Sequence, residues 1–273
     1  MGLVSLATRF SAGEGGALIF QYIGQLLLEI SQTTGEMLKL LFSTVYSFKE
    51  APRNLPSIFR QLAEIGVNTL PIVMLMALFI GMVLALQTGS ALVLYGSQSV
   101  IGSIVGLSMV KELGPVMTSL LVAGRVGSAM AAEIGAMEIY EEIDALKTLE
   151  ISPVRYLAMP RLIACLAAVP ALVIFAVFIG IIGGGIICAI NPQIDVPITT
   201  YYDGIVQSMK VLDIIKGLTK AMVFGGIVGL VGCYVGFKTT GGARGIGRST
   251  TRSVVLSFLL IFIANYFLTR VMM

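Results

Sequence analysis

The sequence predicts an all-α membrane protein with an N-terminal interfacial helix, five transmembrane helices and a cytoplasmic amphipathic helix between the second and third of them. Three observations predict this class. Hydrophobic residues make up 56% of the 273 residues and charged residues only 12%, with a mean hydropathy of +0.94, which lies outside the usual range of soluble domains. The apolar residues gather in runs long enough to cross a bilayer as helices. A charged segment with helical periodicity separates two of these runs.

The N-terminal part of the chain, residues 1–60, differs from the rest. From Leu18 to Phe48 charged and polar residues interrupt the apolar ones, a pattern typical of a helix lying in the membrane interface. The segment from Lys49 to Arg60 contains Pro52 and Pro56, which favour a linker that turns the chain into the bilayer. We therefore expect residues 61–273 to form a five-helix transmembrane domain.

Five apolar segments predict the spans. They run approximately over Leu70–Leu86, Val100–Met130, Tyr156–Ile190, Leu218–Phe237 and Val254–Leu268. Pro115 lies inside the second span, where proline removes a backbone donor and clashes with the preceding turn. We expect a bend or a break there.

Two charged residues, Lys111 and Glu112, also lie inside the second span. Charges at this depth are costly and usually face the bundle interior or a wet cavity, so function is the default hypothesis for them. Lys220, near the outer end of the fourth span, is a possible partner for Glu112. Purely structural pairing is the rival interpretation.

The distribution of lysine and arginine predicts the orientation, because cytoplasmic loops carry the excess of these residues. Twelve lie on one side of the predicted bundle: Arg9, Lys39, Lys49, Arg53, Arg60, Lys147, Arg155, Arg161, Lys238, Arg244, Arg248 and Arg252. The opposite side has Lys210, Lys216, Lys220 and Arg270. The N-terminus is therefore expected in the cytoplasm.

Several function classes are disfavoured by residue usage. The chain has no histidine and only three widely separated cysteines, so catalytic and metal-binding constellations are not expected. No basic run is interleaved with aromatic residues, which argues against nucleic acid as a partner. The segment Gly242–Ser249 imitates the spacing of a phosphate-binding loop, but it follows a transmembrane helix and not a strand. We expect no cofactor in this chain.

Small residues recur at four-residue spacing, as in Ala123, Gly127, Ala131 and Gly135, Gly180 and Gly184, and Gly225 and Gly229, with Gly232 and Gly236 following. Such spacing allows helices to approach closely. Packing within one chain and a seam between two copies are both compatible with it.

The loop after the second span carries the amphipathic segment. Ile139, Ile143 and Leu146 fall on one helical face at i, i+4 and i+7, and carboxylates occupy the rest. Such a helix can seat in a groove of a partner protein. The alternative is a solvated loop whose apolar side rests on lipid.

The same region resembles known permeases. Asp144–Leu149 followed by Ser152-Pro153 and Met159-Pro160 resembles the EAA loop of bacterial ABC-transporter permeases. The longer string from Glu112 to Glu142 resembles the MlaE (YrbE) family of lipid-transport permeases more specifically. Ile80–Gln87 and Gly245–Val255 extend this resemblance, which covers most of the chain from Leu70 onward.

The resemblance implies a permease subunit, not an enzyme, that moves phospholipids or related lipids between the bacterial inner membrane and the outer envelope. It implies a homodimer that works with a cytoplasmic ABC ATPase, which binds ATP and Mg and hydrolyses the ATP, and with a periplasmic MCE-domain protein. The implied location is the bacterial inner membrane. It also implies that the charged loop is the docking site of the ATPase.

Two sets of candidate site residues follow. The expected substrate path comprises Leu84, Gln87, Leu92, Tyr95, Lys111, Glu112 and Lys220. The expected ATPase-coupling helix comprises Glu138, Ile139, Tyr140, Glu142, Ile143 and Leu146. Near the cytoplasmic ends of the spans, Arg125 is placed to reach lipid headgroups and Glu133 to brace the turn into the docking loop. Arg248 and Arg252 would meet headgroups or the ATPase, or serve only as positive-inside anchors.

A secondary transporter or channel driven by an ion gradient is the alternative function, with Lys111 and Glu112 as its ion site. Inverted repeats would favour this alternative. An odd number of five spans shows no convincing repeat between its halves.

Overall fold

The computed structural model describes residues 15–48, 54–194 and 196–272, and these form helices joined by short turns, with no strand among them. The chain divides into two compact units, Met1–Ser43 and Thr44–Met273. In the first unit, the helix predicted from Leu18 to Phe48 is confirmed as α2, Gly15–Tyr46. Its interfacial position stays a prediction. Arg9, Lys49, Pro52 and Arg53, which supported the predicted orientation and linker, lie outside the described residues.

The second unit is a helical bundle whose described residues include five helical segments long and apolar enough to cross a membrane, as predicted. The segments are Leu55–Val93, Gln98–Ile139, Val154–Ile190, Val211–Phe237 and Gly242–Met272. Each is longer than the apolar run that predicted it: the third and fourth begin earlier and end at the predicted Ile190 and Phe237, and the other three extend at both ends. Helix α3 (Leu55–Gly66) crosses the domain boundary that the sequence suggested between residues 60 and 61.

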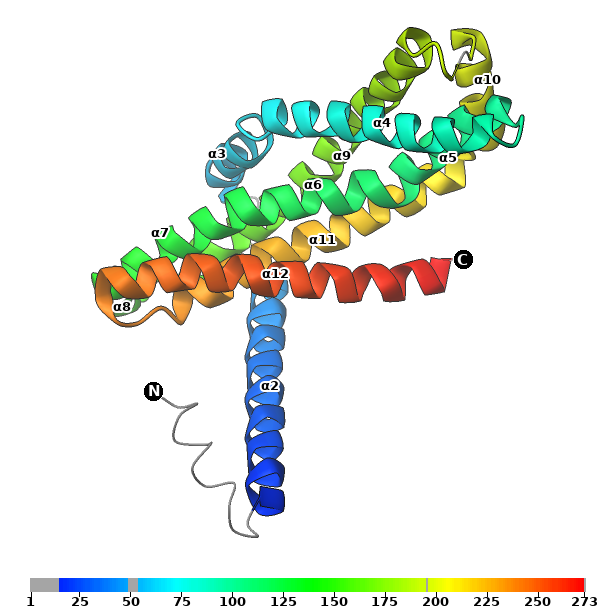
Figure 1. Ribbon diagram of the computed structural model, residues 1–273. Coiled ribbons are helices and arrows are strands. Elements are labelled where there is room, and N and C mark those ends of the chain that lie inside the picture. Colours follow the sequence, from blue (N-terminus) through cyan, green and yellow to red (C-terminus); the bar gives the residue numbers. More distant parts are fainter. Residues whose placement is uncertain (1–14, 49–53, 195, 273) are drawn as a thin grey trace. The chain divides into compact units, whose positions relative to one another are not determined.

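Three of the spans are single helices or nearly so, and two are composite (Figure 1). The first consists of α3 and α4 (Leu70–Val93). The third is the π turn η5 (Val154–Ala158) with α9 (Met159–Ile190), and the last two are α11 (Val211–Phe237) and α12 (Gly242–Met272). The short helices α8 (Glu142–Thr148) and α10 (Ile198–Ser208) lie at opposite ends of this unit (Figure 1).

The second span is built from six consecutive segments. They are η2 (Gln98–Val100), α5 (Ile101–Ser108), the π turn η3 (Met109–Leu113), α6 (Gly114–Val122), the π turn η4 (Ala123–Gly127) and α7 (Ser128–Ile139). Of the bend or break expected at Pro115, the break does not occur, because the wider π turn precedes the proline and places it in the first turn of α6. A bend there stays a prediction. The N–H of Gly114 donates to the carbonyl of Met109, five residues earlier.

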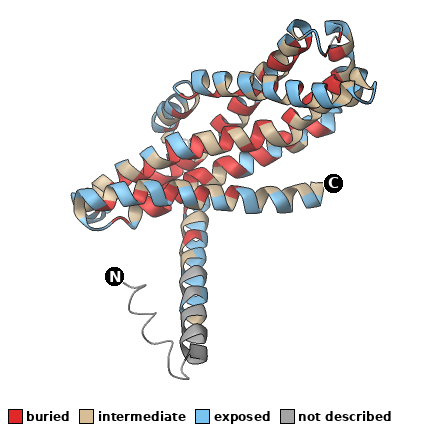
Figure 2. Ribbon diagram, viewed as in Figure 1, coloured by how far each residue is buried: buried red, intermediate tan, exposed pale blue. Residues whose placement is uncertain are grey.

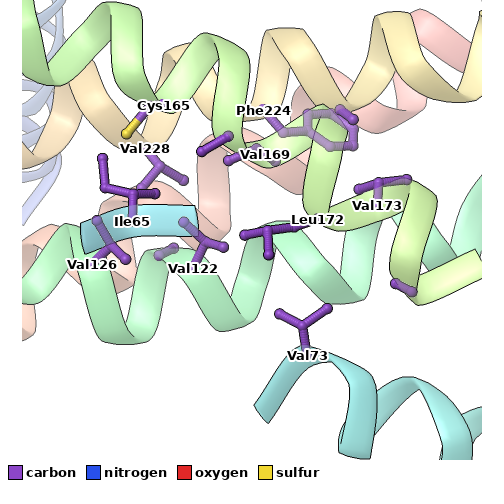
Figure 3. Close-up of a cluster of buried hydrophobic side chains, with 14 of the residues drawn as sticks. Ile65, Val73, Val122, Val126, Cys165, Val169, Leu172, Val173, Phe224 and Val228 are labelled. Atoms are coloured by element: carbon purple, nitrogen blue, oxygen red, sulfur yellow. The ribbon is translucent and has the colours of Figure 1, made fainter. Parts of the chain in front are cut away.

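Two hydrophobic cores hold the bundle together. The larger one joins α3, α4, α6, α9, α11 and α12, and Figure 3 shows Ile65, Val122, Leu172 and Phe224 converging in it. The smaller one lies near the opposite end from α8 and includes Tyr201, whose hydroxyl donates to the carbonyl of Ile181 at 3.0 Å. Buried residues accordingly lie on the facing sides of the spans, and exposed residues lie on their outer sides (Figure 2).

The small residues allow close helix approach within this chain. A Cβ added to Gly81 of α4 would lie 1.9 Å from the carbonyl oxygen of Gly180 in α9, so the two backbones touch. A Cβ added to Gly236 of α11 would lie 2.6 Å from Cβ of Ile134 in α7. The packing interpretation of the four-residue spacing is therefore confirmed for these seams, and a seam between two copies stays untested.

Candidate functional site

A polar cluster lies inside the bundle, where the second, fourth and fifth spans meet. Lys220 of α11 places its Nζ 2.6 Å from Oε1 of Glu112 in η3 and 2.8 Å from Oγ1 of Thr269 in α12. The same ammonium donates to the carbonyl of Lys111 at 3.1 Å. The second carboxylate oxygen of Glu112 accepts a hydrogen bond from Nδ2 of Asn265 at 3.1 Å. The structure thus pairs Lys220 with Glu112, as the sequence suggested.

These contacts explain how a charged lysine can lie inside an apolar bundle. The Lys220 side chain is only 4% exposed, and three oxygen acceptors surround its ammonium group. A buried charge needs such a partner set to offset the loss of hydration. One polar atom of the cluster is unsatisfied: Oδ1 of Asn265 is buried and has no hydrogen-bond partner in the described part of the chain.

Lys111 belongs to a second ion pair. Its Nζ lies 2.9 Å from Oδ1 of Asp213, near the start of α11. Asp213 and Lys220 are seven residues apart, so they lie on the same face of α11. Lys111 and Glu112 therefore do not act as one charged pair, because each reaches a different turn of the same neighbouring helix. Asp213 was not among the residues expected from the sequence, where its seven-residue spacing from Lys220 was the only signal.

A cavity of about 210 Å³ opens beside the cluster. Its lining comprises Lys111, Glu112, Lys216, Lys220, Thr269 and Met272. Three lysines and one glutamate line it, and Asp213 pairs with Lys111, so these five side chains carry one net positive charge. Such a surface suits an anionic group, for example a phosphate.

A second cavity, of about 230 Å³, has an apolar lining. It is bordered by η3 and α11, as the polar cavity is, and also by α9. Val110 and Gly217 contribute to it next to Lys111 and Lys216 of the polar cavity, and Phe178 of α9 lies on the other side. The apolar cavity lies on the α9 side of η3 and α11 and the polar cavity on the α12 side, and no residue lines both.

The remaining residues of the expected substrate path lie elsewhere. Leu84 and Leu92 pack against the smaller core, whereas Gln87 and Tyr95 are exposed. In the described residues these four do not line the polar cavity. The structure therefore brings together only Lys111, Glu112 and Lys220 of that set.

The expected coupling helix is divided by a turn. Helix α7 ends at Ile139, Glu141 adopts a left-handed conformation with φ of 59°, and α8 begins at Glu142. The single apolar face expected for Ile139, Ile143 and Leu146 is therefore not formed. Instead Ile143 is buried in this chain, with 2% exposure.

The exposed apolar side chains of this region are Tyr140 and Leu149, at 72% and 69% exposure. Of the other coupling candidates, Glu142 is exposed, and Glu138, Ile139 and Leu146 are half-buried. Leu149 was not among the candidates. It follows the last residue of α8, and the spacing of apolar residues in the sequence does not predict its exposure. Within α8, a hydrogen bond from Lys147 to Asp144 at 2.7 Å raises the pKa of the lysine, and both side chains are exposed.

Further charged residues lie towards the α8 end of the spans. Arg125 in η4 donates from Nη1 to Oγ1 of Thr69 at 2.5 Å. Glu133 accepts from Nη2 of the buried Arg161 at 2.7 Å, which ties α7 to α9. Arg248 and Arg252 are exposed on α12. Among the described residues, no group of three or more Cys, Asp or Glu side chains could hold a metal ion.

This fold and this site define a multi-pass membrane protein with a charged cavity inside its helical bundle. The family model "Permease MlaE" matches residues 58–271. The chain therefore belongs to the MlaE permease family.

Proteins with related sequences carry permease names. A probable ABC transporter permease protein of Rickettsia felis is 40% identical over 248 residues, covering 91% of this chain and 95% of the relative. One from Synechocystis is 41% identical over 216 residues, or 78% of this chain and 80% of the relative. Protein TRIGALACTOSYLDIACYLGLYCEROL 1, chloroplastic, of Arabidopsis thaliana is 36% identical over 210 residues, covering 77% of this chain and 59% of the relative.

Proposed function

We propose that this chain is the membrane-spanning subunit of an ABC transporter that moves phospholipids or related lipids between the inner membrane and the outer envelope of a bacterium. It works as a homodimer. A separate cytoplasmic ATPase binds ATP and Mg and supplies the energy, and an MCE-domain protein on the periplasmic side receives or delivers the lipid. Membership of the MlaE family and the names of the relatives support the transporter class.

The observation that carries the lipid proposal is the charged cavity lined by η3, α11 and α12, inside a bundle that belongs to the MlaE family. Lys111 and Lys216 offer N–H groups to a headgroup phosphate, and Lys220, whose three N–H groups are used within the cluster, contributes positive charge and is held by the 2.6 Å ion pair with Glu112. A separate apolar cavity on the α9 side of the same helices is of a kind that suits an acyl chain.

The exposed side chains around α8 are the proposed contact for the ATPase. The bundle presents Tyr140 and Leu149 there without covering them, and apolar anchors of this kind seat helices in partner grooves. Closure of the ATPase on ATP would move α8. Since α7 continues into the span that carries Glu112, this motion would reach the polar cavity.

This function is tested by copurification and by lipid transfer. We expect Tyr140→Asp and Leu149→Asp each to release the ATPase from the purified complex and to abolish ATP-dependent phospholipid transfer between reconstituted vesicles, because a charge would enter an apolar contact. Leu94→Asp is the matched control, since Leu94 is 83% exposed and follows α4. Full ATPase retention with full transfer in both α8-region variants would contradict the proposed contact. A wild-type complex that lacks an ATPase would contradict the transporter class.

A further inference from the structure

A second polar pocket lies between α3 and the η4–α7 segment, separate from the Glu112 cluster. Its volume is about 90 Å³. Gln61 and Glu64 of α3 face Arg125 and Glu133 across it, and its apolar lining includes Ile65 and Met130. No residue of this α3–α7 pocket lines the cavity at Lys220.

The pocket is bordered by a carboxylate, Glu64, and a guanidinium group, Arg125, that do not form an ion pair with each other. Glu133 is already paired with Arg161. Glu64 is exposed and has no hydrogen-bond or ion-pair partner in the described residues. Arg125 uses Nη1 for the hydrogen bond to Thr69, which leaves further N–H donors of its guanidinium group available. A free carboxylate and a partly free guanidinium group therefore border one small cavity.

The arginine paired with Glu133 is largely buried. Arg161 is only 7% exposed, and its Nη2 donates to Glu133. Nη1 of the same guanidinium group is buried and has no hydrogen-bond partner in the described part of the chain. A buried donor without an acceptor is costly and uncommon. Arg161 does not itself line the pocket, and it compensates the charge of Glu133, which leaves Glu64 as the unpaired carboxylate there.

We propose that the α3–α7 pocket binds the headgroup of an amine-bearing zwitterionic phospholipid. The ammonium group lies against Glu64, and the phosphate accepts hydrogen bonds from Arg125. This inference rests on the proposed function for the presence of phospholipid substrates, and it adds a site and a headgroup preference. Arg125 lies in a π turn, an element that is frequent at functional sites.

Size and charge decide between possible occupants. A volume of about 90 Å³ accommodates a small polar group and excludes two acyl chains, which would lie outside the pocket against exposed apolar side chains of the first span such as Phe59 and Val67. A headgroup that is only anionic would meet repulsion from Glu64. A group that is only cationic would leave the donors of Arg125 unused. A zwitterion matches both charges.

The test measures lipid retention without ATP. The full complex is reconstituted in nanodiscs containing equal amounts of phosphatidylethanolamine and phosphatidylglycerol, and retained lipids are counted by native mass spectrometry. We expect the wild type to retain more phosphatidylethanolamine. Glu64→Gln should lower the ratio of the two lipids about two- to fivefold, the range expected for loss of an exposed ion pair. Glu150→Gln makes the same change at an exposed glutamate elsewhere and should leave the ratio unchanged.

A second variant tests the phosphate contact. Arg125→Gln should lower the retention of both lipids, whereas Thr69→Val removes the hydrogen bond between these residues and should leave retention unchanged. Competition with soluble glycerophosphoethanolamine distinguishes recognition of the free headgroup from recognition of the membrane lipid. An unaltered lipid ratio in Glu64→Gln, or an equal change in Glu150→Gln, would overturn the proposal. Lipid retention is measured without ATP, so it does not depend on ATP-driven transfer. Failure of the proposed headgroup site can therefore be distinguished from failure of the proposed transport function.

Discussion

The residue that depends most on its neighbours is Lys220. Its ammonium group is buried, and Glu112 supplies the only carboxylate within ion-pair distance of it among the described residues. Removing one partner of a buried ion pair leaves an uncompensated charge, whereas replacing both with neutral groups of similar size is often neutral.

We expect Glu112→Gln to destabilise the protein by about 3 kcal/mol, because the charge of Lys220 would then lack its counterion. Thermal unfolding in detergent measures this loss. The double variant with Lys220→Met should recover most of the stability and should still fail in phospholipid transfer, because the headgroup site has lost both charges. Normal transfer by the stable double variant would show that the cluster is only structural.

Sequence analysis identified part of this cluster. Lys111, Glu112 and Lys220 were recognisable because charges in apolar spans are rare and usually functional. Their pairing with Asp213 and Asn265 was not, because it depends on the rotation and register of helices that are distant in the sequence. The Arg125 contact with Thr69 depends on tertiary packing in the same way.

Helices α4 and α9 approach each other closely at a glycine in each helix, Gly81 and Gly180. At Gly81 the backbone of one helix touches the backbone of the other, and a carbonyl oxygen cannot move aside as a flexible side chain can. The relative position of these two helices thus depends on the absence of a single methyl group.

We expect Gly81→Ala to destabilise the bundle by about 1–3 kcal/mol, the usual cost of overpacking. Thermal unfolding of the purified protein provides the measurement. Gly124→Ala is the matched control, since nothing lies within 4 Å of a Cβ added there. It should be neutral or slightly stabilising, because alanine favours helix more than glycine does. Equal stability of the two variants would show that α4 and α9 can separate without cost.

The boundary between α7 and α8 shows the limit of periodicity. The pattern of Ile139, Ile143 and Leu146 predicted one continuous helix, but Glu141 adopts a left-handed conformation that sequence does not favour for glutamate. The turn rotates Ile143 into the protein. Periodicity identified an amphipathic segment here, and only tertiary packing determines which of its apolar residues remain exposed.

For the molecule as a whole, hydropathy predicted five spans and all five are present in the described residues. This success has a simple cause, because every backbone polar group in a bilayer must be satisfied within the segment, which leaves the helix as the main solution. Hydropathy does not predict the helix ends or the π turns, because it reports only the length and position of apolar segments. Orientation in the membrane stays a prediction that rests on the lysine and arginine excess.

Labelling of introduced cysteines tests the orientation. The native cysteines Cys165, Cys188 and Cys233 are buried, so the unmodified chain should react little with a membrane-impermeant maleimide. We expect Tyr95→Cys to be labelled in intact spheroplasts and Arg244→Cys only after permeabilisation, because these exposed residues lie at opposite ends of the bundle. The reverse pattern would place the α8 end outside the cytoplasm.

The π turns of the second span have a consequence for comparisons between relatives. Each turn, Met109–Leu113 and Ala123–Gly127, holds one residue more than an α-helical turn needs. Losing that surplus residue would rotate every later side chain by about 100° around the helix axis. Relatives that differ in length by one residue within this span should therefore differ at one of these two turns, and the first of them sets which face carries Lys111 and Glu112.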